Sequence, residues 1–195
     1  MDDIVVYMAE VRVALEHQDM NVDALDHFKK NLNDYKTIFH ELIALKTEIG
    51  LTHESGLYGD LHSAVKKVET VLSGNAEDAL LVAMLQLRRS EKDFMLRRDI
   101  KYVQAFDDGI ARLLTQIQQS NIMFSQKEQL TADVKDYQVN FKKLVDKEVL
   151  FGLTDEDGKM AELREKIHQT DNDTVTLREE TLAEIELGKK QAFII

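Results

Sequence analysis

The chain has 195 residues, a formal net charge of −11, and no cysteine, proline or tryptophan. The acidic balance disfavours nucleic acid as a partner, because phosphates require a basic face. The absence of cysteine excludes disulfides, thiol catalysis and cysteine-based metal sites. Proline removes a backbone donor and clashes with the preceding helical turn, so its absence predicts long unbroken helices and an all-α fold.

The first predicted element is one long helix over residues 4–48. Its apolar residues recur at helical spacing: Ile4, Met8, Val11, Leu15, and later Leu32, Tyr35, Phe39 and Leu42. Gly50 is expected to end this helix in a left-handed cap. Thr52 is expected to cap the next helix, with Glu54 in the first turn, where the helix dipole favours an acid.

Four further segments follow. Helices are expected at about 57–72 and 77–98, separated by Ser73-Gly74-Asn75. A turn near Asp99 leads into a second long helix, about 101–150, whose apolar stripe is Tyr102, Phe106, Gly109, Ile110, Leu113 and Ile117. The last helix is expected from Gly158 toward Ile195.

One corner of the chain occurs twice. Gly50-Leu51-Thr52-x-Glu54-x-Gly56 recurs without a gap as Gly152-Leu153-Thr154-x-Glu156-x-Gly158, 102 residues later. The preceding residues also align, Tyr35 with Tyr137 and Phe39 with Phe141. A duplicated hairpin buries its apolar faces against its twin, so the repeat predicts a helical bundle.

Helix length suggests how the bundles are arranged. At about 1.5 Å per residue, each long helix would extend roughly 70 Å, which exceeds a compact globule. We therefore expect two stacked four-helix bundle modules that share the long helices. One module would comprise 22–72 and 124–174, and the other 1–21, 75–123 and 175–195. Both termini and the Asp99 turn would then lie at one end, and the repeated corners at the other.

Both ends of the chain are apolar, reading DDIVVYM at the start and QAFII at the end. No run of about twenty apolar residues is present, so the chain itself is not expected to span a membrane. Two interpretations remain open: frayed helix ends, or a fragment cut between two membrane-spanning segments.

The segment LRRSEKDFMLRR, residues 87–98, places charges on an apolar helix face. Arg88, Glu91 and Lys92 share that face with Met84 and Met95. Buried charges are costly unless they are paired, so these cations need an anion. One interpretation is an internal ion-pair network with Glu91 or a neighbouring helix. The other is a pocket for an anionic ligand, in which the Arg88 guanidinium holds a carboxylate.

Two more arginines support the second interpretation. Arg178 lies in an otherwise apolar stripe with Val175, Leu182 and Ile185, and Arg12 borders the stripe of the first helix. A metal is not expected, because the single Glu165-x-x-His168 pair falls short of the ligands that a di-iron bundle uses. No catalytic constellation, phosphate-binding loop or cofactor motif is visible.

The RRSEKDFMLR segment, followed by Tyr102-Val103 and Phe106, resembles the helical bimodular sensor domain of bacterial methyl-accepting chemotaxis receptors and some sensor histidine kinases. The two GLTxExG corners resemble the same family, and the resemblance covers essentially the whole chain. Arg88 and Lys92 carry over by their positions in the segment, and Glu91 and Tyr102 are counted with them as candidate ligand-binding residues. Arg12 and Arg178 rest on the apolar stripes alone.

The resemblance implies a periplasmic domain of an inner-membrane protein, held between two membrane-spanning helices and prone to form homodimers. It also implies that a small organic anion, such as a carboxylate, binds and displaces a helix across the membrane. Two alternatives remain: the sensor domain of a histidine kinase, or a helical structural or interaction module without a small-molecule ligand. An enzyme is not expected, because no activated nucleophile or metal set is visible.

Overall fold

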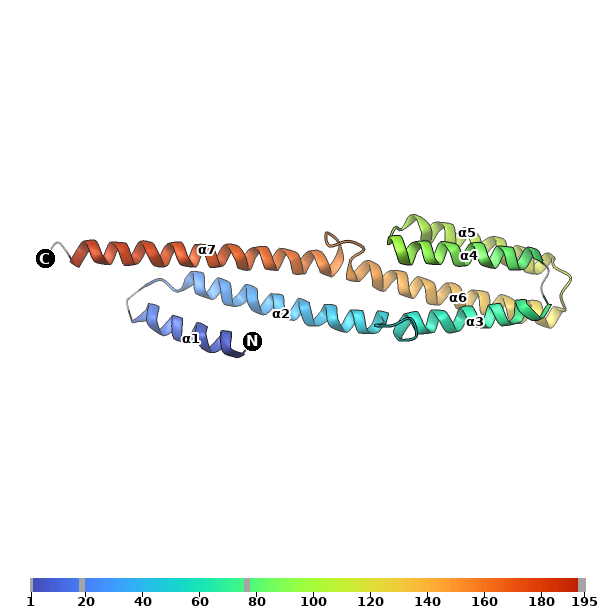
Figure 1. The fold of residues 1–195 in the computed structure, drawn as a ribbon, viewed down its shortest axis with the longest axis horizontal. Coiled ribbons are helices and arrows are strands. Elements are labelled where there is room, and N and C mark those ends of the chain that lie inside the picture. Colours follow the sequence, from blue (N-terminus) through green and yellow to red (C-terminus); the bar gives the residue numbers. More distant parts are fainter. Residues whose placement is uncertain (1, 18–19, 76–77, 193–195) are drawn as a thin grey trace. The chain divides into compact units, whose positions relative to one another are not determined.

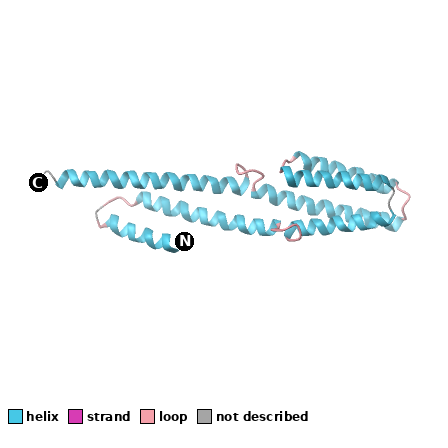
Figure 2. Cartoon of the chain, in the orientation of Figure 1, coloured by secondary structure: helices cyan, strands magenta, loops and turns pink. Residues whose placement is uncertain are grey.

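The computed structural model describes residues 2–17, 20–75 and 78–192. In this part of the chain it contains α-helices and no strands (Figures 1 and 2), so the predicted all-α class is confirmed. The helices are α1 (Asp2–Glu16), α2 (Asp23–Ile49), α3 (Gly56–Asn75), α4 (Asp78–Arg97), α5 (Lys101–Gln119), α6 (Phe124–Phe151) and α7 (Gly158–Ala192). None of the described helices is long and apolar enough to cross a membrane. The apolar end at 193–195 lies outside the described residues.

The two long helices predicted at 4–48 and 101–150 are each interrupted. The first stops at Glu16 and resumes at Asp23, where the Asn21 side-chain oxygen accepts a hydrogen bond of 2.8 Å from the Asp23 backbone N–H. The second stops at Gln119, after which Ser120 is extended and its hydroxyl donates to the Ile117 carbonyl oxygen. Such side-chain bonds to the backbone compete with helix continuation. Neither segment is therefore a single helix of the length from which two stacked bundles were predicted.

The described chain divides into two compact units. The terminal unit comprises Met1–Glu41 and Ala161–Ile195, and the central unit comprises Leu42–Met160. These boundaries differ from the predicted modules, which separated 75–123 from 22–72 and 124–174. The turn after Gln119 reverses the chain, so α5 packs against α6 as well as α4, while α3 pairs with α6.

The central unit is a four-helix bundle made of α3, α4, α5 and α6, with the end of α2. Its core contains the predicted stripe of α5, since Phe106, Ile110, Leu113 and Ile117 are all buried. Aromatic rings fill the middle: Phe106 lies 4.0 Å from Phe141 between ring centroids and 5.1 Å from Tyr137. Phe94 of α4 packs edge to face on Phe141, with ring centroids 5.6 Å apart, and so holds the inner face of α4 against α6.

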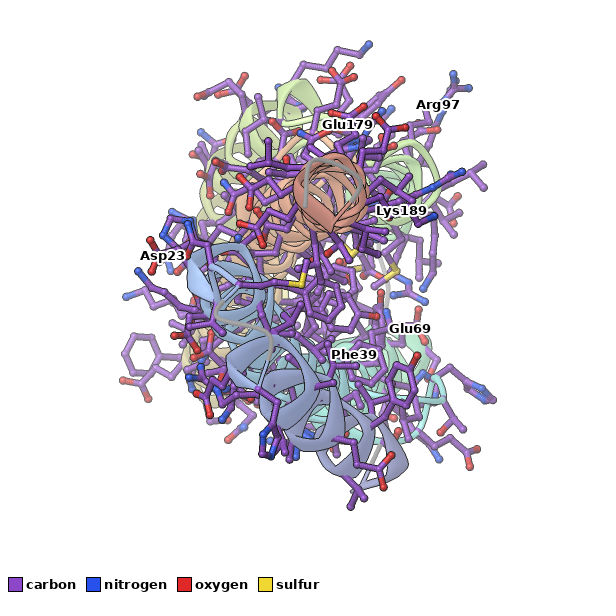
Figure 3. The ribbon with its side chains drawn as sticks, turned by 90° about the vertical axis from the view of Figure 1, so that its left-hand side faces the viewer. Asp23, Phe39, Glu69, Arg97, Glu179 and Lys189 are labelled. Atoms are coloured by element: carbon purple, nitrogen blue, oxygen red, sulfur yellow. The ribbon has the colours of Figure 1, made fainter. Side chains whose placement is uncertain are left out.

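The terminal unit contains α1, the first part of α2 and most of α7. Met8, Leu15 and Leu25 form its buried cluster, with Leu177 of α7 packed against it. Helices α2 and α7 run antiparallel, joined by a hydrogen bond from Asn31 to Asp173 (2.7 Å). Charged side chains, among them Asp23 and Glu179, lie on the outside of these helices (Figure 3).

The two GLTxExG corners have the same backbone conformation, which confirms the repeat. The first glycine has φ of 123° at Gly50 and 119° at Gly152, and the last has φ of 56° at both Gly56 and Gly158. The expected capping by Thr52 is wrong in one respect. Its hydroxyl accepts from the Glu54 backbone N–H (3.4 Å) within the corner, and the helix begins later, at Gly56.

Candidate functional site

A cavity of about 580 Å³ opens at the first corner, within the central unit. Four elements of the unit contribute to its wall. The lining residues are Lys46 of α2; Gly50, Leu51, Thr52 and His53 of the corner; Tyr58, Leu61 and His62 of α3; and Arg88, Glu91, Lys92 and Met95 of α4. This volume is in the range of small-molecule sites, and the wall combines apolar side chains with a few charged ones, as ligand pockets do.

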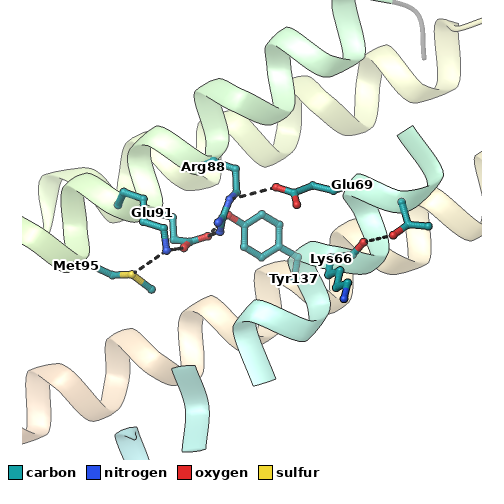
Figure 4. Close-up of polar contacts among 8 residues, drawn as sticks. Lys66, Glu69, Arg88, Glu91, Met95 and Tyr137 are labelled. Carbon is teal, nitrogen blue, oxygen red and sulfur yellow. Dashed lines mark hydrogen bonds and ion pairs between the residues drawn. The ribbon is translucent and has the colours of Figure 1, made fainter. Parts of the chain in front are cut away.

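Glu91 is the centre of a polar network at the inner wall (Figure 4). Its side chain is only 1% exposed, and it accepts hydrogen bonds from the Arg88 guanidinium at 2.6 Å and from the Tyr137 hydroxyl. The Lys92 ammonium lies 2.8 Å from its other oxygen. Three donors thus satisfy a carboxylate that would otherwise be costly to bury.

The network holds two of its members in fixed protonation states. Burial raises the pKa of Tyr137, and the negative charge of Glu91 raises it further. Burial alone would lower the pKa of Arg88, but the adjacent Glu91 carboxylate outweighs this effect and the pKa is raised. Tyr137 therefore stays a neutral donor and Arg88 stays a cation.

The pocket wall carries more cations than acids. Glu91 is the carboxylate on the wall, whereas Lys46, Arg88 and Lys92 are cations. Arg88 has a second acid nearby, since its Nε lies 3.5 Å from an oxygen of the half-exposed Glu69. The imidazole rings of His53 and His62 also line the wall, edge to face, with their centroids 6.4 Å apart. The wall therefore has a positive surplus that suits an anion.

Of the three cations on the wall, Lys46 is the one without an acidic partner among the residues that the structure describes. Its Nζ lies 5.9 Å from the ring centroid of Tyr58 and 5.5 Å from that of Phe151. Cation–π contacts of this kind leave the ammonium able to donate hydrogen bonds to a ligand.

Of the predicted site residues, Arg88, Glu91 and Lys92 come together on the pocket wall. Both interpretations of this segment therefore have support: the ion-pair network is present, and it borders a cavity. Tyr102 does not line the cavity. It lies at the start of α5, where the Arg97 and Lys101 cations face its ring at 5.9 and 5.0 Å.

Arg12 and Arg178 belong to the terminal unit and are not among the lining residues. The Arg12 guanidinium is paired with Glu16 at 3.3 Å and with Asp26. Arg178 is exposed, and so are its stripe neighbours Val175 (55%) and Leu182 (51%). Arg178 is therefore not sequestered by its apolar stripe, because α7 presents that stripe to solvent, whereas the Arg12 side chain is 34% exposed and already paired with two acids.

The second corner is closed by Arg98, which the sequence reasoning missed. Its guanidinium donates to the carbonyl oxygens of Gly152 (2.8 Å) and Leu153 (3.0 Å), and to the Glu148 carboxylate (2.6 Å). Tyr58 also donates to Glu148, at 2.7 Å. Burial raises the pKa of Tyr58, and the bond to Glu148 raises it further.

Lys46, His53 and His62 were also missed, and the repeat contained a signal for the first of them. Lys46 occupies the position that Glu148 occupies in the second copy, so a cation replaces an acid at equivalent corners. No comparable signal exists for the histidines, because their proximity depends on how α3 follows the corner.

Comparison of this chain with protein-family models, with curated proteins and with solved structures gives no match. Among the described residues, no group of three or more histidine, aspartate or glutamate side chains is placed to hold a metal ion. The cavity and the charges on its wall are therefore the features that indicate a function.

Proposed function

We propose that this chain is the extracytoplasmic ligand-binding domain of a transmembrane chemotaxis receptor, and that it binds a small organic anion such as a carboxylate. The observation that carries the proposal is the cavity of about 580 Å³ whose wall has Lys46, Arg88 and Lys92 against one carboxylate, Glu91. The apolar part of the wall, including Leu61 and Met95, suits a short carbon skeleton.

Signalling follows from differential binding. A ligand in the cavity touches the end of α2, the first corner, α3 and α4, so it stabilises one relative placement of these segments over others. Allosteric coupling of this kind typically amounts to about 1–3 kcal/mol. Membrane-spanning segments outside this chain would transmit the resulting helix displacement, and a homodimer in the periplasm would be the signalling unit.

Calorimetric titration with a panel of C2 to C6 carboxylates tests the proposal. A carboxylate that fits should bind with 1:1 stoichiometry, and Lys46→Met should weaken it at least about tenfold, as expected for loss of a charged hydrogen bond. Lys143→Met, on an exposed part of α6 outside the cavity, should leave the affinity unchanged. Equal affinities for the wild type and Lys46→Met would place the ligand elsewhere.

One observation favours a second candidate, a helical structural or interaction module without a small-molecule ligand. Glu91 already neutralises part of the charge of Arg88 and Lys92, as an internal network would. Thermal shift separates the two functions, because a ligand that binds only the folded chain must raise its melting temperature. If no anion raises it, the structural module is the better account. The same binding domain on a histidine kinase would give the same titrations and differ only in output.

A further inference from the structure

The two repeated corners have the same backbone shape but different surroundings. At the second corner, the carbonyl oxygens of Gly152 and Leu153 hold the Arg98 guanidinium. At the first corner, the equivalent residues are Gly50 and Leu51, and both line the cavity. A Cβ added to Gly50 would lie 2.1 Å from the Ser55 carbonyl oxygen, and one added to Gly152 would lie 2.3 Å from the equivalent oxygen of Asp157. The local geometries thus match closely.

Because the φ angles of the glycines at both ends of the corners match, we infer that the first corner presents its two carbonyl oxygens in the arrangement that binds a cation at the second. No described residue donates a hydrogen bond to the carbonyl oxygens of Gly50 or Leu51, whereas Arg98 donates to the equivalent oxygens of Gly152 and Leu153. Two adjacent carbonyl oxygens repel a carboxylate and favour an ammonium or guanidinium donor.

The charged residue beside the carbonyl oxygens has opposite sign at the two corners. The Arg98 guanidinium meets Glu148 beside the carbonyl oxygens, whereas the equivalent position at the first corner is Lys46, which also lines the cavity. A ligand at the first corner would therefore find acceptors for a cation and, next to them, a donor for an anion.

We propose that the ligand of the cavity is an α-amino acid, with its ammonium group on the Gly50 and Leu51 carbonyl oxygens and its carboxylate on the Lys46 ammonium. This inference rests on the proposed function and deepens it by naming the ligand class. On the α4 wall, the two cations Arg88 and Lys92 share the single carboxylate of Glu91. This surplus of positive charge favours a ligand with an acidic side chain over one with a neutral side chain.

Matched ligand pairs test the ammonium group directly. L-Aspartate and succinate share a carbon skeleton and two carboxylates and differ by one amino group, as do L-glutamate and glutarate. Titration of the whole chain by calorimetry should give at least about tenfold tighter binding for the amino acid of one pair. If the deaminated acid binds as tightly, the inference is overturned while the proposed anion binding stands. If no member of either pair and no other carboxylate binds, both are overturned.

A charge reversal at Lys46 tests the carbonyl oxygens. Lys46→Glu reproduces the acceptor set that holds the Arg98 guanidinium: one carboxylate and two carbonyl oxygens. The variant should lose amino-acid binding at least about tenfold and should bind methylguanidinium, which the wild type should not. Lys143→Glu on exposed α6 is the matched control and should behave as the wild type does. A folded Lys46→Glu variant that takes no methylguanidinium overturns the role of the corner.

Lys46→Gln keeps the inference testable if the charge reversal prevents folding. It removes the ammonium group without adding a charge, and it should weaken amino-acid binding at least about tenfold while the circular dichroism spectrum stays the same. Unchanged amino-acid affinity in this variant overturns the inference.

Discussion

Glu91 accepts from three side chains although its carboxylate is almost completely buried. Two of the donors are cations, and the third is the neutral Tyr137 hydroxyl, which reaches Glu91 from α6. A buried acceptor that loses a donor is not compensated by water, so each donor contributes to stability through the desolvation that it offsets.

Replacing Tyr137 by phenylalanine should therefore destabilise the fold by about 1–3 kcal/mol, because one bond to a buried carboxylate is lost. Urea unfolding at neutral pH measures the effect as a lower midpoint with an unchanged slope. Tyr35 is the control, since its half-buried ring stacks on Phe39 at 6.1 Å and its hydroxyl bonds to none of the described residues. Tyr35→Phe should change the stability by less than about 0.5 kcal/mol. Equal losses in both variants would contradict the role of the network.

Arg98 closes the second corner with a single planar guanidinium that reaches Glu148, Gly152 and Leu153. Lysine keeps the charge, but it is a compact point donor that cannot span these three acceptors together. Arg98→Lys should therefore cost about 2–4 kcal/mol, most of it from the poorly paired Glu148, which is 4% exposed.

The neighbouring Arg97 supplies a matched control for this substitution. Its side chain is 59% exposed and pairs with Asp93 at 3.3 Å on the helix surface. Surface pairs contribute about 0–1 kcal/mol, so Arg97→Lys should have little effect when the thermal unfolding of both variants is compared with that of the wild type. A loss in Arg97→Lys as large as that in Arg98→Lys would show that charge and helix propensity alone account for both.

At the scale of the elements, the strongest sequence signals predicted structure correctly. The repeated corners and the apolar stripe of α5 are both observed, because glycine at positive φ and apolar spacing are local requirements. The breaks near Asn21 and Ser120 were missed. A side-chain bond to the backbone is present beside each break, made by residue types that also occur inside helices, and no glycine or proline marks the end of the helix.

The equivalence of the corners makes a prediction about their first glycines. Alanine at Gly50 or Gly152 would hold a Cβ at positive φ and within 2.1 or 2.3 Å of a carbonyl oxygen. Each substitution should cost at least about 1–3 kcal/mol, and the two losses should be similar, because the two backbones have the same conformation. Urea unfolding of both variants measures this. If one glycine tolerates alanine and the other does not, the corners are not structural equivalents.

At the scale of the whole chain, part of the site could be predicted and part could not. Arg88, Glu91 and Lys92 share one face of a single helix, so their proximity follows from helical spacing. Lys46 and His62 join them only because the end of α2 and the start of α3 meet α4. Helix pairing depends on where each turn reverses the chain, and the turn after Gln119 was not predicted, so the packing of α5 against α6 could not be predicted either.

The two units also differ in how much apolar surface they bury. The buried apolar residues of the central unit form one large cluster, whose members come from residues 45–145. In the terminal unit the buried cluster consists of Met8, Leu15 and Leu25 among the described residues, while Tyr7 and Val13 of α1 are more than half exposed. Local opening free energies rise with buried apolar contact, so α1 should open far more readily than α6.

Hydrogen exchange on the whole chain, followed by mass spectrometry, tests this difference. Amides of α1 should exchange at least about 100-fold faster than those of α6, because opening α1 exposes little buried surface.

Recording exchange at low and high protein concentration separates the chain's own stability from association. If a second copy covers the exposed apolar side chains of α1, as the proposed homodimer would allow, protection of α1 should rise with concentration while that of α6 stays constant. Protection of α1 equal to that of α6 in the dilute sample would contradict the expected division of stability between the units.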